Sequence, residues 1–206
     1  LFKYLDRWMY SCYDKVIAVT NQVQTSLEEF SGGHPGLCSI QNGINLDLYS
    51  SSTSSETRFS ASLQRLTIVM IGRFEAPKDQ RTVIESLSLI ERDCRCIFIG
   101  EGSKKAECIA YAKSLGLSDK VEFLGFRSDL PTILEACQIA VLSSAYEGFG
   151  LAAVETMAAG IPTIASKVEV LKDVVANEDL LFDFGDAVGL KNIIYKVVAS
   201  KQIYFG

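Results

Sequence analysis

The residues best suited to chemistry lie in one stretch of the chain, residues 143–166, which reads SSAYEGFGLAAVETMAAGIPTIAS. Gly148 and Gly150 allow the backbone to approach a ligand with no Cβ in the way. The run LAAVETMAA that follows is compatible with a helix, whose first amides would point into the same space and attract a phosphate. We therefore expect a site for a phosphorylated ligand in the turn before this helix.

Two glutamates border the expected site. Glu147 precedes the glycines, and Glu155 lies eight residues further on, inside the helix. Both carboxylates can therefore face one pocket, in which a diphosphate-linked sugar would fit. An ordinary structural role is also open, because Gly-Phe-Gly turns are common and a glutamate near the start of a helix often only complements the helix dipole.

Strands and helices alternate around this stretch in the manner of βαβ units. Strands are expected at 66–72, 94–100, 120–125, 138–142, 162–166 and 179–184, and helices at 79–90, 103–115, 168–176, from Asp186 and, more briefly, after Asp129. The alternation predicts an α/β fold with a doubly wound parallel sheet. In such a sheet, ligands bind beyond the carboxyl ends of the strands, at the switch point between the first and fourth strands.

Two basic residues follow the first of these strands. Arg73 and Lys78 would face the glycine-rich turn from across the crevice, where two cations can clamp a diphosphate. A charge-assisted hydrogen bond contributes about 1.5–3 kcal/mol, against about 0.3–1 kcal/mol for a helix dipole, so the side chains should dominate binding. The alternative is that both are solvated loop charges.

The chain divides into three expected parts: residues 1–45, 46–64 and 65–206. In the first part we expect an amphipathic helix over 1–12, a buried strand over 14–20, a helix from Asn21 to about Phe30, and a strand over 37–45. The second part contains six consecutive Ser or Thr residues and is predicted to be a linker. The third part holds the alternating elements and the expected site.

Composition excludes several kinds of site. With 20 Lys plus Arg against 25 Asp plus Glu and no basic cluster, a nucleic-acid partner is not expected. The six cysteines form no CxxC pair, and His34 is the single histidine, so neither a zinc site nor a His-based triad can be assembled. We expect reduced core cysteines and a cytoplasmic protein with no membrane span, while the first helix leaves a peripheral membrane contact open.

Three motifs together resemble a known family. EGFGLAAVE followed by MAAGIPTIAS is similar to the E-x7-E signature of retaining GT-B glycosyltransferases of family 4, the group 1 glycosyltransferases. GRFEAPK matches the G-R-x-x-x-x-K setting of this family, and Asn-Gly-Ile-Asn at 42–45 matches its hinge. The resemblance implies that residues 65–206 are the Rossmann-like, C-terminal, donor-binding domain and that residues 1–45 are a remnant of the N-terminal acceptor domain.

The resemblance also assigns roles to individual residues. It implies that Arg73 and Lys78 hold the donor diphosphate, that Glu147 contacts the donor sugar and that Glu155 binds the ribose. The remaining substrate-binding positions that it implies are Gly72, Gly148, Phe149, Gly150 and Leu151 near the donor, and Phe126 and Arg127 in the loop that reads the nucleobase. No metal or other cofactor is expected, because cationic side chains and helix amides would stabilise the leaving group.

The implied activity is transfer of a hexose from a nucleotide diphosphate sugar to a glycan or lipid-linked acceptor, with retention, as in polysaccharide biosynthesis. This chain alone is expected to bind the donor but to transfer little, and to act in the cytoplasm or at the inner face of the membrane. Glu169 and Val170 depart from the pattern, standing where the family commonly has a Gly-Gly pair, with Asp173 in place of its glutamate.

Other functions compatible with the same fold stay open: a nucleotide-sugar epimerase, a phosphorylase, or a non-catalytic nucleotide-binding module. A dinucleotide-binding module is disfavoured because Gly100-Glu101-Gly102 continues to Lys105 where the fingerprint needs a third glycine. The donor sugar, its base and the acceptor are not determined by these motifs.

Overall fold

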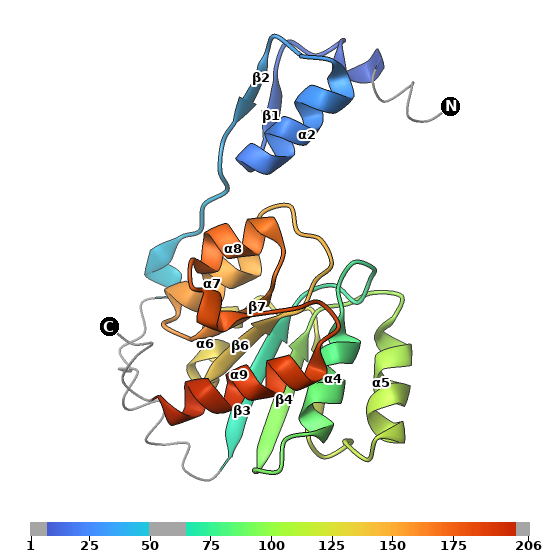
Figure 1. The fold of residues 1–206 in the computed structure, drawn as a ribbon, viewed down its shortest axis with the longest axis vertical. Coiled ribbons are helices and arrows are strands. Elements are labelled where there is room, and N and C mark those ends of the chain that lie inside the picture. The colour runs from blue at the N-terminus through green and yellow to red at the C-terminus, as the bar shows by residue number, and fades with distance from the viewer. Residues whose placement is uncertain (1–7, 50–64, 201–206) are drawn as a thin grey trace.

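The structure is a computed structural model that describes residues 8–49 and 65–200. It shows a small N-terminal lobe and a larger sheet domain, joined by the extended residues 40–45 (Figure 1). Most of the expected linker and residues 1–7 of the expected first helix lie outside the described residues, so those predictions are untested there. Residues 8–10 are helical.

The small lobe contains two parallel strands and one helix. Strand β1 (Val16–Ala18) pairs with β2 (Leu37–Ser39), and α2 (Asn21–Ser31) connects them. The helix begins where Thr20 accepts a hydrogen bond from the amide of Val23 and ends at Gly32, which has a φ of 77°. The predicted strand, helix and strand are confirmed, but both strands are shorter than expected. The first is not buried as predicted, since 55% of Ile17 is exposed.

The larger domain is built on a parallel sheet of six strands in the order β5-β4-β3-β6-β7-β8. These strands are β3 (Leu66–Ile71), β4 (Cys94–Ile99), β5 (Val121–Gly125), β6 (Ile139–Leu142), β7 (Thr163–Ser166) and β8 (Leu181–Phe182). The doubly wound sheet is thereby confirmed. Its first and fourth strands, β3 and β6, are hydrogen-bonded neighbours, so the switch point lies where the sequence predicted it.

Helices cover both faces of this sheet (Figure 1). They are α4 (Gln80–Ser88), α5 (Lys105–Ser114), α6 (Leu130–Glu135), α7 (Leu151–Ala158), α8 (Glu169–Val175) and α9 (Ala187–Ala199), with 3₁₀ turns η1 (Leu46–Leu48) and η2 (Glu178–Leu180). Because strand side chains alternate between faces, Ile68 and Met70 of β3 enter one core, shared with α4, α5 and α9. Val69 and Ile71 point to the other core, shared with α6, the end of α7 and Tyr49.

Two details differ from the sequence-based expectation. The last strand is only Leu181–Phe182, because Asn177 accepts a hydrogen bond from the amide of Asp179 and begins a 3₁₀ turn there. Cys12 is exposed rather than in a core. The cysteines of the sheet domain are buried as expected, and burial raises the pKa of the Cys96 thiol well above its usual value.

Candidate functional site

The turns that follow β3 and β6 lie side by side at the carboxyl edge of the sheet. Lys78 and Ser144 form an isolated antiparallel bridge between them. On either side of this bridge, the amide of Asp79 donates to the carbonyl of Ser143 (3.0 Å), and the amide of Ala145 donates to the carbonyl of Pro77 (3.0 Å). The backbone therefore holds together the two turns that carry the predicted cations and carboxylate.

Lys78 and Glu147 form an ion pair within this edge. The ammonium group contacts Oε1 of Glu147, and the hydroxyl of Ser144 donates to the same oxygen over 2.7 Å. Only 18% of the Lys78 side chain and 11% of the Glu147 side chain are exposed. The sequence predicted that both residues serve the site, but it did not predict that they contact each other.

A buried serine on the neighbouring strand β7 holds the backbone of Ser144 in place. The hydroxyl of Ser166, at the end of β7, accepts the amide of Ser144 (2.6 Å) and lies within hydrogen-bond distance of the carbonyls of Ser144 (2.8 Å) and Leu142 (3.1 Å). Ser166 is fully buried, so its hydroxyl needs these partners. Sequence reasoning missed both serines. The available signal was a hydroxyl residue at the carboxyl end of each of two neighbouring strands.

Arg73 lies on the same turn after β3 as Lys78, and its exposed side chain forms no ion pair with any residue that the structure describes. Its carbonyl accepts a hydrogen bond from the side-chain amide of Gln80 (2.9 Å), which fixes the backbone. Nearby, Glu75 accepts both the amide and the hydroxyl of Ser103 (2.7 Å each), and these bonds lower the pKa of its carboxyl group. The turn after β3 is thus tied to the turn after β4.

Gly100 and Gly102 are required by this contact between turns. A Cβ on Gly100 would clash with the carbonyl oxygen of Gly72, and one on Gly102 would clash with that of Phe74. Both glycines have a positive φ, of 144° and 155°. The Gly-Glu-Gly motif therefore has a structural reason, close backbone packing, that needs no bound ligand.

The two glycines before α7 differ in their surroundings. Gly150 has a φ of 82° at the N-cap of α7, and a Cβ there would lie 2.8 Å from Cδ2 of Leu171. A Cβ on Gly148 would meet no atom within 4 Å, so Gly148 borders open space. Phe149 lies between them, and the amide of Leu151 begins a helix with no side-chain cap. This leaves donors free to face a ligand.

Glu155 projects from the second turn of α7 and meets Tyr49. The phenol hydroxyl donates to Oε1 of Glu155 over 3.1 Å, although the two residues are 106 positions apart. Burial raises the pKa of Glu155, an effect that this hydrogen bond opposes. Burial and the carboxylate together raise the pKa of Tyr49 to about 12. Tyr49 fell within the predicted linker and was missed.

The loop after β5 lies at the same edge of the sheet, since the amide of Gly100 donates to the carbonyl of Gly125 (2.8 Å). Phe126 is 81% exposed. The guanidinium of Arg127 is paired with the carboxylate of Asp129, with 2.7 Å between Nε and Oδ1, which raises the pKa of Arg127. The backbone of this loop was predicted to contact the nucleobase, and that role stays a prediction.

Glu169 and Val170, the two departures from the family pattern, both begin α8. Glu169 pairs with Lys172 over 2.7 Å, and Val170 is buried. Asp173 is exposed on the same helix. Because Leu171 of α8 lies against Gly150, this helix packs directly behind the glycine-rich turn.

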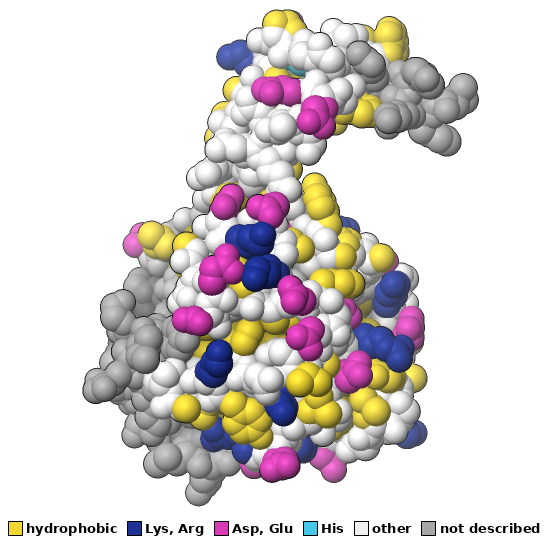
Figure 2. Space-filling view, viewed as in Figure 1, with side chains coloured by type: hydrophobic (Ala, Val, Ile, Leu, Met, Phe, Trp, Pro, Cys, Tyr) yellow, Lys and Arg dark blue, Asp and Glu magenta, His cyan; other side chains and the backbone are white. Residues whose placement is uncertain are grey.

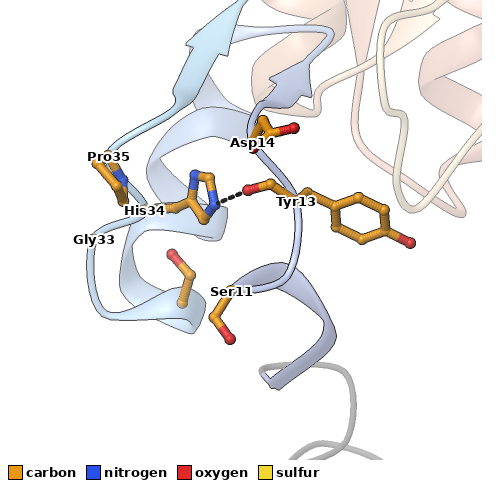
Figure 3. Close-up of a pocket in the computed structure, with 7 residues that line it drawn as sticks. Ser11, Tyr13, Asp14, Gly33, His34 and Pro35 are labelled. Carbon is orange, nitrogen blue, oxygen red and sulfur yellow. Dashed lines mark hydrogen bonds between the residues drawn. The ribbon is translucent and has the colours of Figure 1, made fainter.

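A pocket of about 360 Å³ lies elsewhere, in the small lobe (Figure 3). His34 lines it, and Nδ1 of its ring accepts the amide of Gly36 (3.0 Å), so Nε2 carries the proton and donates to the carbonyl of Tyr13 (2.9 Å). Both ring nitrogens are therefore engaged with the backbone. The imidazole has a structural role there and is not positioned as a catalytic base.

The described residues bring together no group of three or more His, Cys, Asp or Glu side chains that could hold a metal ion. Within the same ranges, no helix has both the length and the apolar character needed to cross a bilayer. On the face seen in Figure 2, acidic and basic side chains are interspersed over the sheet domain.

Comparison with known proteins decides the family. The sequence profile described as "Glycosyl transferases group 1" matches residues 54–203. The chain belongs to the group 1 glycosyltransferases. The solved structures most like it include HepE from Anabaena in complex with UDP-glucose, with a TM-score of 0.85, 26% identity, and coverage of 97% of this chain and 58% of that one.

Curated relatives of the chain include enzymes that act on different acceptors, by their names. It is 23% identical to an N-acetyl-alpha-D-glucosaminyl L-malate synthase of Bacillus anthracis, over 93% of this chain and 52% of the relative. It is 24% identical to an Escherichia coli UDP-Gal:alpha-D-GlcNAc-diphosphoundecaprenol alpha-1,3-galactosyltransferase, over 98% of this chain and 56% of the relative. The chain therefore spans about half the length of the curated relatives that it matches.

The mostly buried ion pair generates a stability prediction. Lys78→Met should lower the free energy of unfolding by about 1–3 kcal/mol, because it leaves the Glu147 carboxylate short of a partner in a poorly solvated place. The double variant Lys78→Met/Glu147→Gln should lose less than the sum of the two single variants. Urea unfolding followed by circular dichroism measures both.

Lys105→Met is the matched control for this prediction, because the partner of Lys105, Glu101, is 60% exposed. It should cost less than about 1 kcal/mol. Equal losses for Lys78→Met and Lys105→Met, or strict additivity in the double variant, would contradict the buried pairing.

Proposed function

We propose that this chain forms the donor-binding part of a glycosyltransferase that moves a hexose from a nucleotide diphosphate sugar to a glycan or lipid-linked acceptor, with retention of anomeric configuration. The observation that carries the proposal is the meeting of Lys78 and Glu147 beside the open space at Gly148. Retention rests on the resemblance of the E-x7-E stretch alone.

In this proposal, the diphosphate binds between the turns after β3 and β6. Arg73 is exposed and free of ion pairs with described residues, so its guanidinium can turn to a phosphate without breaking a contact. The ammonium group of Lys78 has three donors, and its contact with Glu147 uses one of them, so capacity remains for a phosphate oxygen. The first amides of α7 supply neutral donors on the same side.

The proposed catalytic effect is electrostatic. When the bond between the sugar and the diphosphate breaks, negative charge grows on the leaving phosphate. Lys78 and the amides are already held in place to stabilise this charge, and Arg73 turns toward it. Because the two side chains supply this positive charge, we propose that donor binding does not require a divalent cation. Glu147, held at the sugar side of Lys78, contacts the sugar in this arrangement.

Glu155 takes the ribose in the same proposal, because its carboxylate lies further along α7 than the phosphate-binding amides. Uridine diphosphate is the proposed nucleotide. The support is that the HepE structure holds UDP-glucose and that the Escherichia coli relative is named for UDP-Gal. Phe126, exposed in the loop after β5, is proposed to border the base.

Nucleotide selectivity tests the proposed function. The chain should bind UDP in titration calorimetry more tightly than NAD, and an excess of EDTA should leave the affinity for UDP unchanged. The reason is that the turn after β3 carries two cations, Arg73 and Lys78, for a terminal diphosphate. Gly100 and Gly102 serve backbone packing and give no sign of a dinucleotide site. A preference for NAD would refute the glycosyltransferase assignment, and loss of binding in EDTA would refute the metal-independent clamp.

The two glutamates should separate in their effects. Glu155→Gln should weaken UDP binding by up to about 1.5–3 kcal/mol, because a carboxylate accepts from ribose hydroxyls more strongly than an amide does. Glu147→Gln should change the affinity for UDP much less and should act with the sugar attached, which calorimetry with UDP and UDP-glucose can show. If both variants lowered the affinity for UDP equally, or if neither changed any affinity, the assignment of Glu155 to the ribose and Glu147 to the sugar would be wrong.

A further inference from the structure

Tyr49 makes a contact that the proposed function does not use. It ends the connector, which we define as residues 40–49, the segment between strand β2 of the small lobe and the sheet domain. Only 9% of Tyr49 is exposed, and its ring belongs to the core that contains Val69 and Ile161. From this core its hydroxyl reaches Oε1 of Glu155 (3.1 Å).

The 3₁₀ turn η1 fixes the position of the Tyr49 side chain. Asn45 accepts a hydrogen bond from the amide of Asp47 and begins the 3₁₀ turn η1, and the amide of Tyr49 closes that turn by donating to the carbonyl of Leu46 (2.9 Å). Leu46 and Leu48 point outward, being 64% and 61% exposed, whereas the aromatic ring between the turn and the sheet is buried. An aromatic side chain packed in this way has few alternative rotamers, so its hydroxyl occupies a defined position.

We infer that Tyr49 is a positioning residue for the nucleotide site, aiming the Glu155 carboxylate at the ribose and so making the connector part of the donor-binding machinery. The inference rests on the proposed function, because it takes the ribose assignment of Glu155 as its starting point. It adds a residue from a segment that lies outside the glycine-rich motifs.

The chemistry of the contact fits an orienting role. Each carboxylate oxygen has two lone pairs, so Oε1 can accept the phenol while Oε2 stays available for a ribose hydroxyl. Without the phenol, the partly buried Glu155 side chain would have no fixed partner for Oε1, so it would sample more rotamers and would lose more entropy on binding. A fixed carboxylate avoids that cost, which is the general advantage of a preorganised site.

The same contact favours the ionised form of Glu155. Among the described residues, Tyr49 is the titratable group that faces this carboxylate, and its hydrogen bond acts against the burial that raises the pKa of Glu155. The pKa of Tyr49 is about 12, so the phenol is protonated and donates at every physiological pH. Removing the hydroxyl should therefore raise the pKa of Glu155 further.

Tyr49→Phe tests the inference, because it removes the hydroxyl and keeps the buried ring. In titration calorimetry of the full 206-residue chain, we expect this variant to bind UDP roughly three- to tenfold more weakly, as for the loss of one hydrogen bond. Its affinity for inorganic pyrophosphate, which has no ribose, should be unchanged. As the pH is lowered, the affinity of Tyr49→Phe for UDP should fall off at a higher pH than that of the unaltered chain. Carbon-13 NMR of labelled glutamate should show the raised pKa of Glu155 without any ligand.

Tyr195→Phe is the matched control. It also removes a phenol with one hydrogen bond, which the phenol oxygen accepts from the amide of Glu91 (3.2 Å). Tyr195 is 36% exposed and lies on α9, which packs on the opposite face of the sheet from Tyr49. The substitution should change neither UDP affinity nor the pKa of Glu155. A general loss of packing would instead lower affinity for UDP and pyrophosphate together.

The outcomes separate this inference from the proposed function. If Glu155→Gln lowers the affinity for UDP, and Tyr49→Phe leaves that affinity unchanged or increases it, the positioning role of Tyr49 is refuted. The ribose assignment of Glu155 then stands. If the unaltered chain does not bind UDP, or Glu155→Gln has no effect, the proposed function fails and the inference fails with it. An unchanged pKa of Glu155 in Tyr49→Phe would also refute the positioning role.

Discussion

The adjacency of β3 and β6 is the constraint on which the rest of the site depends. These strands are the first and fourth of the sheet domain, so the chain must cross back over the sheet to bring them side by side. The turns that follow them therefore lie next to each other at the carboxyl edge of the sheet. Lys78 and Glu147, each on one of the two turns, meet there because the backbone bridge between Lys78 and Ser144 brings them together.

Close backbone packing and buried hydroxyls then make the edge rigid. Gly100 and Gly102 allow the turn after β4 to touch the turn after β3, and Ser166 fixes Ser144 from the neighbouring strand. Such contacts cost little reorganisation when a charged ligand arrives, which is the property that an electrostatic site requires. Gly148 stands apart from this packing because nothing lies within 4 Å of the place where its Cβ would be.

The sheet, its helices and the switch point could be predicted because most strands carry their own buried apolar run, and because a glycine stands at or just after the end of several of them, such as Gly72, Gly100 and Gly125. The pairing of Lys78 with Glu147 could not, because a pattern places residues on turns without showing which way their side chains point. Tyr49 was missed for another reason: it stands beside a run of Ser and Thr, and its partner Glu155 lies 106 residues away. The last strand was predicted too long, because a side-chain contact from Asn177 begins a 3₁₀ turn and prevailed over strand propensity at residues 179–180.

The central claim is that the nucleotide diphosphate binds at this edge and not in the pocket of the small lobe. Titration of the nitrogen-15-labelled chain with UDP, followed by two-dimensional NMR, tests it directly. We expect the amide signals of residues 72–76, of Lys78 and of residues 147–152 to shift most, while those around His34 and Tyr13 do not shift. Shifts concentrated around His34 and Tyr13, with the signals of the two turns unchanged, would contradict it.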